Sequence, residues 1–553
     1  MASALSKSAP SQSTLSEALP TALPSEWQQL QNGSDIRGVA LEGVAGERVN
    51  LTPEIAYRLG QGFVGWLGKK MGKESADLVV SVGRDSRLSG PALRDGLTAG
   101  MRSLGVKVYD FAIASTPAMF MSTVTEGYEC DGAIMLTASH LPFNRNGLKF
   151  FTAEGGLNKP DITEILSLAS KNNFFTATTE GKLEERDFIS VYAEGLVAKI
   201  REGVNHAEQY DQPLKGLHII VDAGNGAGGF YADKVLKPLG AETSGSQFLE
   251  PDGTFPNHIP NPENAEAMAA IRSAVLEHKA DFGIIFDTDV DRSAAVDSQG
   301  QALNRNKLIA LISAVVLREH PGSTIVTDSI TSDGLADFIA GLGGVHHRFR
   351  RGYKNVINES VRLNAAGQES WLAIETSGHG AMQENYFLDD GAYLVSKLLV
   401  ELARARKAGK LITDLIADLK EPAESEEFRL KILVDDFKTH GNGVIEDLRS
   451  HIANQSGETQ PDWNIVPNNY EGVRVACSAP DEDGWFLLRL SLHDPVLPLN
   501  VESNVAGGVA KICDRLTQFF TNITDLDTTD LNTTDLDTTD PDTADPDTAA
   551  LSQ

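Results

Sequence analysis

The chain has 553 residues, of which 41% are hydrophobic and 23% charged, so several folded domains are expected and disorder throughout is excluded. Its formal charge of −29 argues against sequence-independent binding to nucleic acid, because clustered Lys and Arg hold phosphate backbones. The longest apolar runs, such as 308–317, are too short to span a bilayer, so no membrane segment is expected. Three widely separated cysteines offer neither a disulfide framework nor metal-ligand spacing, which favours a reducing, cytoplasmic location.

The two ends of the chain differ in composition from its body. Residues 1–32 are rich in Ser, Ala and Pro without a sustained period, which predicts a disordered arm. A transit peptide is the alternative, although such peptides contain few acidic residues and this arm contains Glu17 and Glu26. Residues 524–553 repeat a five-residue unit rich in Asp and Thr that cannot bury enough apolar surface to fold, so we predict a disordered tail.

One pattern recurs three times between these ends. Each copy has an apolar run, a turn, a helical stretch and a Leu-Gly pair, and the apolar runs are 78–82, 218–222 and 324–328. The runs are apolar enough to be buried strands, and Gly can end a helix in a left-handed conformation. Repeated strand–helix–strand units predict three related α/β/α domains with mixed sheets, and a single domain with one long sheet is the alternative.

After about residue 426 the pattern changes to strands separated by Gly, Asn and Pro turns, followed by a helical stretch near 504–520. This change predicts a smaller C-terminal α+β domain, and the fold class is therefore α/β with this domain added. The expected segments are the disordered arm (1–32), domain I (33–205), domain II (206–303), domain III (304–424), domain IV (425–523) and the disordered tail (524–553).

The first candidate segment for chemistry is 137–142, which follows an apolar run. Ser139 would lie on a loop beyond a strand, with His140 beside it and Lys149 ten positions further along. These residue types fit a nucleophile, a proton carrier and a cation for a transferred group. Ordinary turn chemistry is the alternative, because Ser and His before Pro are common in turns.

The second segment places aspartates at alternate positions, Asp287, Asp289 and Asp291, after another apolar run. They converge if the backbone turns into a loop there, and three hard oxygen ligands suit Mg²⁺ or Ca²⁺. An EF-hand calcium loop is excluded, because it needs Gly and Glu where this chain has Arg292 and Ser298. A solvated acidic turn with Arg292 as its charge partner is the alternative.

The third segment contains Glu375, Ser377 and His379 after the apolar run 371–374. A carboxylate and a hydroxyl can bind sugar hydroxyls, since one accepts hydrogen bonds and the other donates or accepts them. His379 can move a proton near neutral pH, and a purely structural histidine is the alternative.

In this order, the three segments resemble the α-D-phosphohexomutase family, which includes phosphoglucomutase, phosphomannomutase and phosphoglucosamine mutase. The family's phosphoserine loop, T-A-S-H-x-P with N-G-x-K downstream, is matched by 137–142 and 146–149. Its metal loop, D-G-D-x-D-R, is matched except that Thr288 stands at the usual Gly, and its sugar loop, E-x-S-G-H, is matched by 375–379. The resemblance covers about residues 33–503.

The resemblance implies four domains around one central cleft and an isomerase that interconverts hexose 1-phosphate and hexose 6-phosphate, with glucose and mannose as the expected sugars. Phosphorylated Ser139 would pass its phosphoryl group to the sugar, and hexose 1,6-bisphosphate would be both intermediate and activator. One Mg²⁺ per chain would be bound by Ser139 and the three aspartates. The expected partners are small hexose phosphates, and the chain is expected to be a monomer or a dimer.

The resemblance also assigns individual residues to the site. The implied catalytic residues are Ser139, His140, Lys149, Arg37 and Arg292. The implied metal ligands are Ser139, Asp287, Asp289 and Asp291. The implied substrate-binding residues are Glu375, Ser377, His379, Lys354, Arg489, Ser491 and His493.

The family's fourth loop, close to R-x-S-G-T-E-P with a later Arg, holds the phosphate that is not transferred and is only partly matched. Arg489 and Ser491 keep their places, whereas Leu492 replaces a small residue, His493 a hydroxyl and Asn500 the later Arg. We expect phosphate to be held through Arg489, Ser491, backbone N–H groups and protonated His493. The alternative is a weakened phosphate site with a changed substrate or a non-catalytic role.

Two further functions remain open from the sequence. One is a metal-dependent phosphatase or phosphotransferase that uses Asp287 as its nucleophile, which predicts label from the substrate on Asp287 instead of Ser139. The other is a regulator that binds sugar phosphates without turnover.

Overall fold

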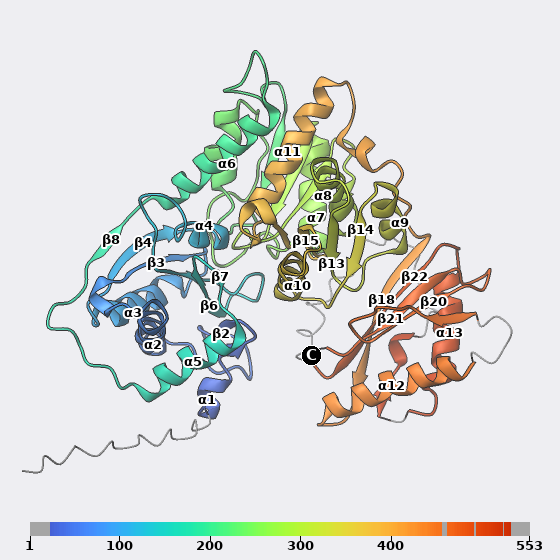
Figure 1. Cartoon of the computed structure of the whole chain (residues 1–553), viewed down its shortest axis with the longest axis horizontal. Coiled ribbons are helices and arrows are strands. Elements are labelled where there is room, and N and C mark those ends of the chain that lie inside the picture. Colours follow the sequence, from blue (N-terminus) through green and yellow to red (C-terminus); the bar gives the residue numbers. More distant parts are fainter. Residues whose placement is uncertain (1–22, 456–461, 492–493, 524, 532–553) are drawn as a thin grey trace, which may run out of the picture.

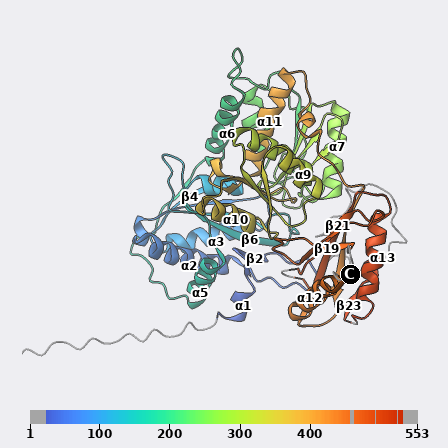
Figure 2. The ribbon, with the colours of Figure 1, turned by 45° about the vertical axis from the view of Figure 1, so that its right-hand side comes forward.

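The computed structural model describes residues 23–455, 462–491, 494–523 and 525–531. Within them the chain forms four successive lobes, each built on its own β-sheet (Figure 1). The first three combine mixed sheets with helices and the fourth is antiparallel with two helices, so the predicted fold class is confirmed. Figure 2 shows the same lobes after a 45° turn, with the last helix on the outer side of the fourth lobe.

Domain I contains a mixed 8-stranded sheet between two layers of helices. Residues Ile134 and Leu136 of its fifth strand face one helical layer and Ala133 and Met135 face the other, as expected for a strand buried on both sides. The elements are α1 (Ser25–Gln28), β1 (Gln31–Asn32), β2 (Asp35–Val39), α2 (Pro53–Met71), β3 (Val79–Arg84), α3 (Gly90–Arg102), β4 (Lys107–Ile113), α4 (Thr116–Met121), β5 (Gly132–Leu136), β6 (Arg145–Thr152), β7 (Gly155–Gly156), α5 (Lys159–Lys171), β8 (Leu183–Glu185) and α6 (Phe188–Val204).

Domains II and III repeat the parallel strand pair of domain I and then turn back through antiparallel strands. The elements of domain II are β9 (Ile219–Asp222), a π-helix (Tyr231–Leu236), α7 (Ala265–His278), β10 (Phe282–Phe286), β11 (Ser293–Asp297) and β12 (Ala302–Leu303). The elements of domain III are α8 (Arg305–Glu319), β13 (Thr324–Thr327), α9 (Asp333–Gly341), β14 (Val345–Arg348), α10 (Tyr353–Ala365), β15 (Ser370–Ile374), β16 (Gly380–Met382), β17 (Leu388–Asp389) and α11 (Gly391–Lys407).

Domain IV is an antiparallel sheet in the order β19-β20-β21-β22-β18-β23, packed on two helices. Its elements are β18 (Glu424–Ile432), α12 (Phe437–Gln455), β19 (Trp463–Ile465), β20 (Val473–Cys477), β21 (Gly484–Leu488), β22 (Val496–Ser503), α13 (Gly508–Phe520) and β23 (Leu526–Asp527).

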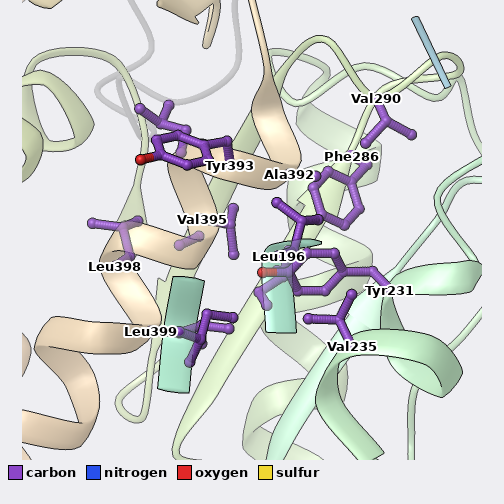
Figure 3. Packing of buried hydrophobic residues seen from close by; sticks show 14 of the residues in the cluster. Leu196, Tyr231, Val235, Phe286, Val290, Ala392, Tyr393, Val395, Leu398 and Leu399 are labelled. Atoms are coloured by element: carbon purple, nitrogen blue, oxygen red, sulfur yellow. The ribbon is translucent and has the colours of Figure 1, made fainter. Parts of the chain in front are cut away.

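Domains II and III share one apolar core, which also receives residues of domain I, whereas domain IV has its own. Figure 3 shows Ala392 and Leu399 of α11 among Leu196 of α6, Tyr231 of the π-helix and Phe286 of β10. The sequence analysis placed α6 in domain I, yet this helix packs mainly against α11 and the π-helix, because its apolar face completes the shared core.

Domain IV meets domain III through polar groups and through the ring of Tyr470, whose centroid lies 5.1 Å from that of Phe349 and 5.3 Å from that of His347. The Arg474 guanidinium donates to the carbonyl oxygens of Ser329 (3.0 Å) and Thr331 (3.1 Å) and pairs with Asp333 at 2.9 Å. From the neighbouring loop, Glu471 accepts a hydrogen bond from Ser329 Oγ at 2.5 Å. The apolar cluster of domain IV lies on the other face of its sheet.

The three repeated strands are confirmed as β3, β9 and β13, but the helix after the second is irregular. There the chain forms the π-helix and then a short 3₁₀ turn, Lys237–Leu239. Pro238 lies inside this turn, and proline lacks the N–H that a regular helix needs. Gly240 closes the turn in the left-handed conformation, with φ of 86°, as the Leu-Gly pattern predicts.

The predicted disordered segments, 1–32 and 524–553, include residues that are folded in the structure. Trp27 of α1 and Leu30 are buried against domain I, so the folded chain begins before residue 33. At the other end Leu526 and Leu531 are buried, and β23 adds an edge strand beside β18. These few apolar side chains were hidden by the polar composition around them. Residues 1–22, 524 and 532–553 of the predicted arm and tail lie outside the described residues.

Among the helices in the described ranges, none has both the length and the apolar character that crossing a bilayer requires. The three cysteines are free and buried.

We predict that Trp27→Ala lowers the stability of domain I by about 3 kcal/mol, because the indole is a large buried side chain beneath the Arg58 guanidinium. The change should appear as a lower midpoint of the domain I transition in thermal or urea unfolding. Phe175→Ala is the matched control, since that ring is 91% exposed and its loss should change stability by less than about 0.5 kcal/mol. Equal effects of the two substitutions would contradict a structural role for α1.

Candidate active site

The aspartate loop connects β10 to β11, which pair from Phe286 opposite Ser293. Asp287, Asp289 and Asp291 are all fully buried, and one oxygen from each lies within 4.8 Å of the others. The structure therefore brings together the three carboxylates, as their spacing predicts, and they do not form a solvated turn.

Val290, within this loop, has the left-handed φ of 68° that β-branched residues rarely adopt. Its side chain packs in the shared core beside Phe286 and Ala392 (Figure 3). Its carbonyl accepts a hydrogen bond from Gly391 N–H of α11 at 3.2 Å. Packing with domains II and III thus compensates the strain that turns the aspartates toward one another.

Lys149 of β6 reaches this loop from domain I. Its Nζ donates to Asp289 Oδ2 at 2.9 Å and also to Asp291 Oδ2. Burial alone would lower the pKa of Lys149, but Asp289 and Asp291 outweigh burial and hold that pKa well above its ordinary value. The Lys149 ammonium is therefore a permanent positive charge against the two carboxylates.

Thr116, at the start of α4, is a contact that the sequence analysis missed. Its hydroxyl donates to Asp289 Oδ2, and its N–H donates to the Asp289 carbonyl at 2.8 Å. The sequence signal there, Ser115 before Thr116 and Pro117, predicts only the start of a helix. Thr116 and Lys149 together occupy one oxygen of Asp289.

The remaining oxygens of two aspartates, Asp289 Oδ1 and Asp291 Oδ1, are buried and have no hydrogen-bond partner. Burial and the two neighbouring carboxylates raise the pKa of Asp287 well above its ordinary value. The negative charge of the cluster is therefore not fully balanced by Lys149 and Arg292. Buried, unpartnered carboxylate oxygens in a group of three fit a hard divalent cation.

Ser139 follows β5 on a loop where it takes a left-handed φ of 52°. Its Oγ donates to Asp287 Oδ2 at 3.1 Å, accepts from Arg292 Nη2 at 3.1 Å and lies 3.3 Å from His140 Nδ1. The buried Arg87 guanidinium fixes the loop by donating to the carbonyl oxygens of Ser139, Leu141, Pro142 and Arg145.

Arg292 links the serine to the aspartates. Its Nε donates to Asp287 Oδ2 at 3.2 Å, and its Nη2 donates to His140 Nδ1 at 2.6 Å as well as to Ser139. Burial would lower the pKa of Arg292, but Asp287 and Asp291 outweigh it and raise that pKa. Four of the predicted catalytic and metal residues, Ser139, His140, Arg292 and Asp287, thus lie in one hydrogen-bonded network.

The third segment, between β15 and β16, lies against the aspartate loop. A β-bridge joins Arg292 to His379, and Glu375 Oε1 accepts from Gly352 N–H at 2.6 Å. His379 Nδ1 lies 2.5 Å from Asp389 Oδ2 and 3.9 Å from Asp291 Oδ1. Ser377 is buried on the same loop.

The pKa values of the Glu375 carboxyl and the His379 imidazole in this loop are both raised, for different reasons. Burial and the nearby Asp328 raise the pKa of Glu375 to about 7. Burial would lower the pKa of His379, but Asp389 and Asp291 raise it to about 9. At neutral pH His379 is therefore a cation beside the aspartates.

Two predicted residues have other partners. Arg37 of β2 pairs with Asp35 at 3.3 Å. Lys354 Nζ donates to the Gly156 carbonyl of domain I at 2.6 Å. Lys354 also lines a cavity of about 210 Å³ between domains I and III, together with Lys149 and Asp291.

The fourth loop lies near Arg351 of domain III. Arg489 is buried, and its Nε has no hydrogen-bond partner. Glu427 of β18, which the sequence analysis missed, accepts from Asn500 Nδ2 at 2.8 Å. Burial would raise the pKa of Glu427, but Arg351 and Arg489 outweigh burial and lower it. A carboxylate thus lies among the cations of this loop.

Ser491 Oγ accepts from Asp494 N–H at 3.2 Å, which turns the chain back toward β22. Leu492 and His493, including the predicted phosphate contact of His493, lie outside the described residues.

Comparison with known proteins supports the resemblance found in the sequence. Family models for phosphoglucomutase/phosphomannomutase alpha/beta/alpha domains I, II and III match residues 28–176, 193–300 and 304–421. The chain is 31% identical over 485 residues to a phosphomannomutase/phosphoglucomutase of Pseudomonas aeruginosa, covering 87% of this chain and 94% of that protein. The chain belongs to the α-D-phosphohexomutase family.

Two further members of the family show similar coverage. A phosphoglucomutase of Neisseria gonorrhoeae is 28% identical over 477 residues, covering 86% of this chain and 94% of that protein. The X-ray structure of a phosphoglucomutase/phosphomannomutase family protein from Burkholderia thailandensis superposes with a TM-score of 0.69 at 28% identity, covering 88% of this chain and 96% of that one.

As a phosphohexomutase, the protein is an isomerase of carbohydrate metabolism, an intramolecular phosphotransferase. The relatives do not favour the two alternatives, a phosphatase with an aspartate nucleophile and a regulator without turnover.

We predict that Asp389→Asn lowers the pKa of His379 from about 9 toward the ordinary value near 6.5, because the substitution removes the nearest negative charge. NMR titration of the imidazole in metal-free buffer would measure the change. A raised folded-state pKa stabilises the fold fully below pH about 6.5, and this contribution is lost as the pH rises through about 9, so the variant should lose stability chiefly on the acidic side of that window.

Asp418→Asn, an exposed substitution in domain III, is the control and should leave the His379 titration in place. An unchanged pKa in Asp389→Asn would contradict the assigned cause.

Proposed function

We propose that this phosphohexomutase interconverts hexose 1-phosphate and hexose 6-phosphate, of glucose or mannose, with Ser139 as the carrier of the phosphoryl group. The main observation behind the proposal is the position of Ser139 Oγ, which is hydrogen-bonded to both Asp287 and Arg292. A hydroxyl at the edge of a buried carboxylate cluster and beside a fixed guanidinium is suited to phosphoryl transfer, where catalysis is mostly positioning and charge stabilisation. The names of the relatives support glucose and mannose as the sugars.

The reaction consists of two transfers in opposite directions. In the first, the bond between phosphorus and Ser139 Oγ breaks while a free sugar hydroxyl forms a new bond to phosphorus. The sugar hydroxyl proton passes to the released Ser139 Oγ, and His140, whose Nδ1 is 3.3 Å from that oxygen, carries it. The product is hexose 1,6-bisphosphate, which reorients in the site. It then returns its other phosphoryl group to Ser139 Oγ, while the serine proton returns to the sugar oxygen that is released.

The chain's own cations act on the group in transfer. Arg292 Nη2, already on Ser139 Oγ, donates to a phosphoryl oxygen, and Lys149 balances the aspartates beside it. Arg37 lies one strand from Lys149 and assists phosphoryl binding. Because Arg292 and Lys149 are held by buried ion pairs, they need no rearrangement when charge shifts during transfer.

We assign one Mg²⁺ per chain to the aspartate loop. Asp287, Asp289, Asp291 and the Ser139 side chain would hold it, and the unpartnered Oδ1 atoms of Asp289 and Asp291 support this assignment. When bound, Mg²⁺ neutralises negative charge on the phosphoryl oxygens.

The sugar is oriented by the third loop and the far phosphate by the fourth. Glu375 and Ser377 offer hydrogen bonds to sugar hydroxyls, and protonated His379 adds a donor. The unpartnered Nε of Arg489 supports a role in phosphate binding. The proposed substrate-binding set is Glu375, Ser377, His379, Lys354, Arg489 and Ser491. Hexose 1,6-bisphosphate acts as activator because it rephosphorylates Ser139.

We predict that wild-type protein converts glucose 1-phosphate and mannose 1-phosphate to their 6-phosphates in a coupled assay with Mg²⁺ and a trace of bisphosphate. Ser139→Ala should reduce kcat by about 10³-fold or more, because the phosphoryl carrier is lost. Ser170→Ala, on the outer helix α5, is the control. Peptide mapping should place the phosphate on Ser139, and a phosphate on Asp287 would contradict the proposal.

We predict that Thr116→Val weakens Mg²⁺ binding by about tenfold, because its hydroxyl turns Asp289 so that Oδ1 stays available. Titration calorimetry on the metal-free protein measures the affinity. Thr123→Val is the matched control, since that hydroxyl donates to the Phe120 carbonyl. Asp289→Asn should abolish the saturable heat, and unchanged binding in this variant would refute the assigned ligands.

A further inference from the structure

A short loop of domain II, residues 258–264, reaches the phosphoserine site without belonging to any of the four motif loops. It runs from the end of an irregular segment to Asn264, whose side chain caps α7 by accepting from Ala267 N–H at 3.0 Å. Asn261, at its centre, is 1% exposed. A buried polar side chain on a connecting loop calls for a specific partner.

Asn261 has two such partners. Its Oδ1 accepts a hydrogen bond from Arg292 Nη1 at 3.1 Å and another from the Glu263 N–H of its own loop at 3.1 Å. Glu263 Oε2, two residues further along, lies 3.9 Å from Arg292 Nη1. Nη1 is the part of the guanidinium that faces away from both the serine and the aspartates.

The three nitrogens of Arg292 thus have separate partners. Nε is bonded to Asp287 at 3.2 Å, Nη2 to Ser139 Oγ at 3.1 Å and Nη1 to Asn261. A planar guanidinium held at all three corners cannot rotate about its own axis. Without Asn261, one corner is released, and the fork can turn so that Nη2 leaves Ser139.

The loop itself is rigid. Both ring nitrogens of His258 face acceptors, since Nε2 lies 3.0 Å from Asp222 Oδ2 and Nδ1 lies 2.9 Å from the Ile259 carbonyl. Pro260 and Pro262 flank Asn261, and proline restricts both its own φ and the residue before it. The loop therefore fixes the position of Asn261 independently of its contact with Arg292.

We propose that Asn261 is a positioning residue for phosphoryl transfer, which holds Arg292 against the oxygen that gives and receives the phosphoryl group. The proposal rests on the proposed role of Ser139. A line of contacts runs from Asp222 at the end of β9 to His258, then to the Ile259 carbonyl, which accepts from Asn261 N–H at 2.8 Å, and from Asn261 to Arg292. The sheet of domain II thereby fixes a cation at the transfer site.

The test compares Asn261→Ala with Asn261→Asp, which keeps an oxygen acceptor for Nη1, in the full-length protein. Asn261→Ala should reduce kcat by about 10- to 100-fold with little change in KM, because the substrate contacts are intact while Arg292 is loosened. Asn261→Asp should restore kcat to within about tenfold of wild type. Asn257→Ala is the matched control in the neighbouring sequence, since that amide donates to Asn225 Oδ1 at 2.7 Å.

A double-mutant cycle separates positioning from a general structural effect. In an Arg292→Lys background, which lacks the fork, Asn261→Ala should cost less than about twofold further in kcat. Full additivity of the two substitutions, or wild-type kcat in Asn261→Ala, would overturn the proposal. Should Asn261→Ala melt early, Asn261→Leu fills the same space without an acceptor and gives the same readout. Absence of mutase turnover in the wild type would instead refute the proposed function.

Discussion

Three carboxylates buried in one loop repel one another, and the arrangement of the site depends on how that charge is balanced. Lys149 bonds to two of them from domain I, while Arg292 bonds to the third from within the loop. A buried charge that loses its partner is strongly destabilising. Because the lysine and the aspartates come from different domains, domains I and II must dock before the charge is balanced. The ion pairs therefore determine domain arrangement as well as local chemistry.

The shared apolar core extends this constraint to domain III. Val290, whose backbone is strained, packs against α11 in this core. The β-bridge between Arg292 and His379 connects the third loop to the aspartate loop. Serine, aspartates and His379 consequently form one rigid unit built from three domains. The positions of these groups are set by packing and charge at a distance from Ser139 Oγ, which is how a preorganised site is held in place.

The sequence predicted the parts that are encoded locally. Buried strands followed by polar residues are short-range signals, and they predicted that Ser139, the three aspartates and the 375–379 segment lie on loops after strands, as the structure shows, together with the three repeated strands. Thr116, Asn261 and Glu427 were missed because each acts through a contact with a distant segment, and nothing in the neighbouring residues indicates that contact. The partner of Lys354 was likewise not predictable, since it depends on how α10 faces β7. Composition concealed Trp27, one indole in a stretch rich in Ser, Ala and Pro.

Domain IV differs from the other three in what binds it to the rest. Its apolar cluster contains only residues of domain IV, and its contact with domain III consists mainly of the hydrogen bonds and ion pairs of Arg474 and Glu471, with the ring of Tyr470 beside Phe349. Water can replace such contacts at small net cost, whereas opening the shared core would expose apolar surface. Because it has its own core, domain IV is expected to unfold separately from the shared core of the other domains. Arg489 belongs to this domain, so the proposed contact with the second phosphate lies on a separately packed domain, whereas Ser139 lies on a loop held by domains I and II.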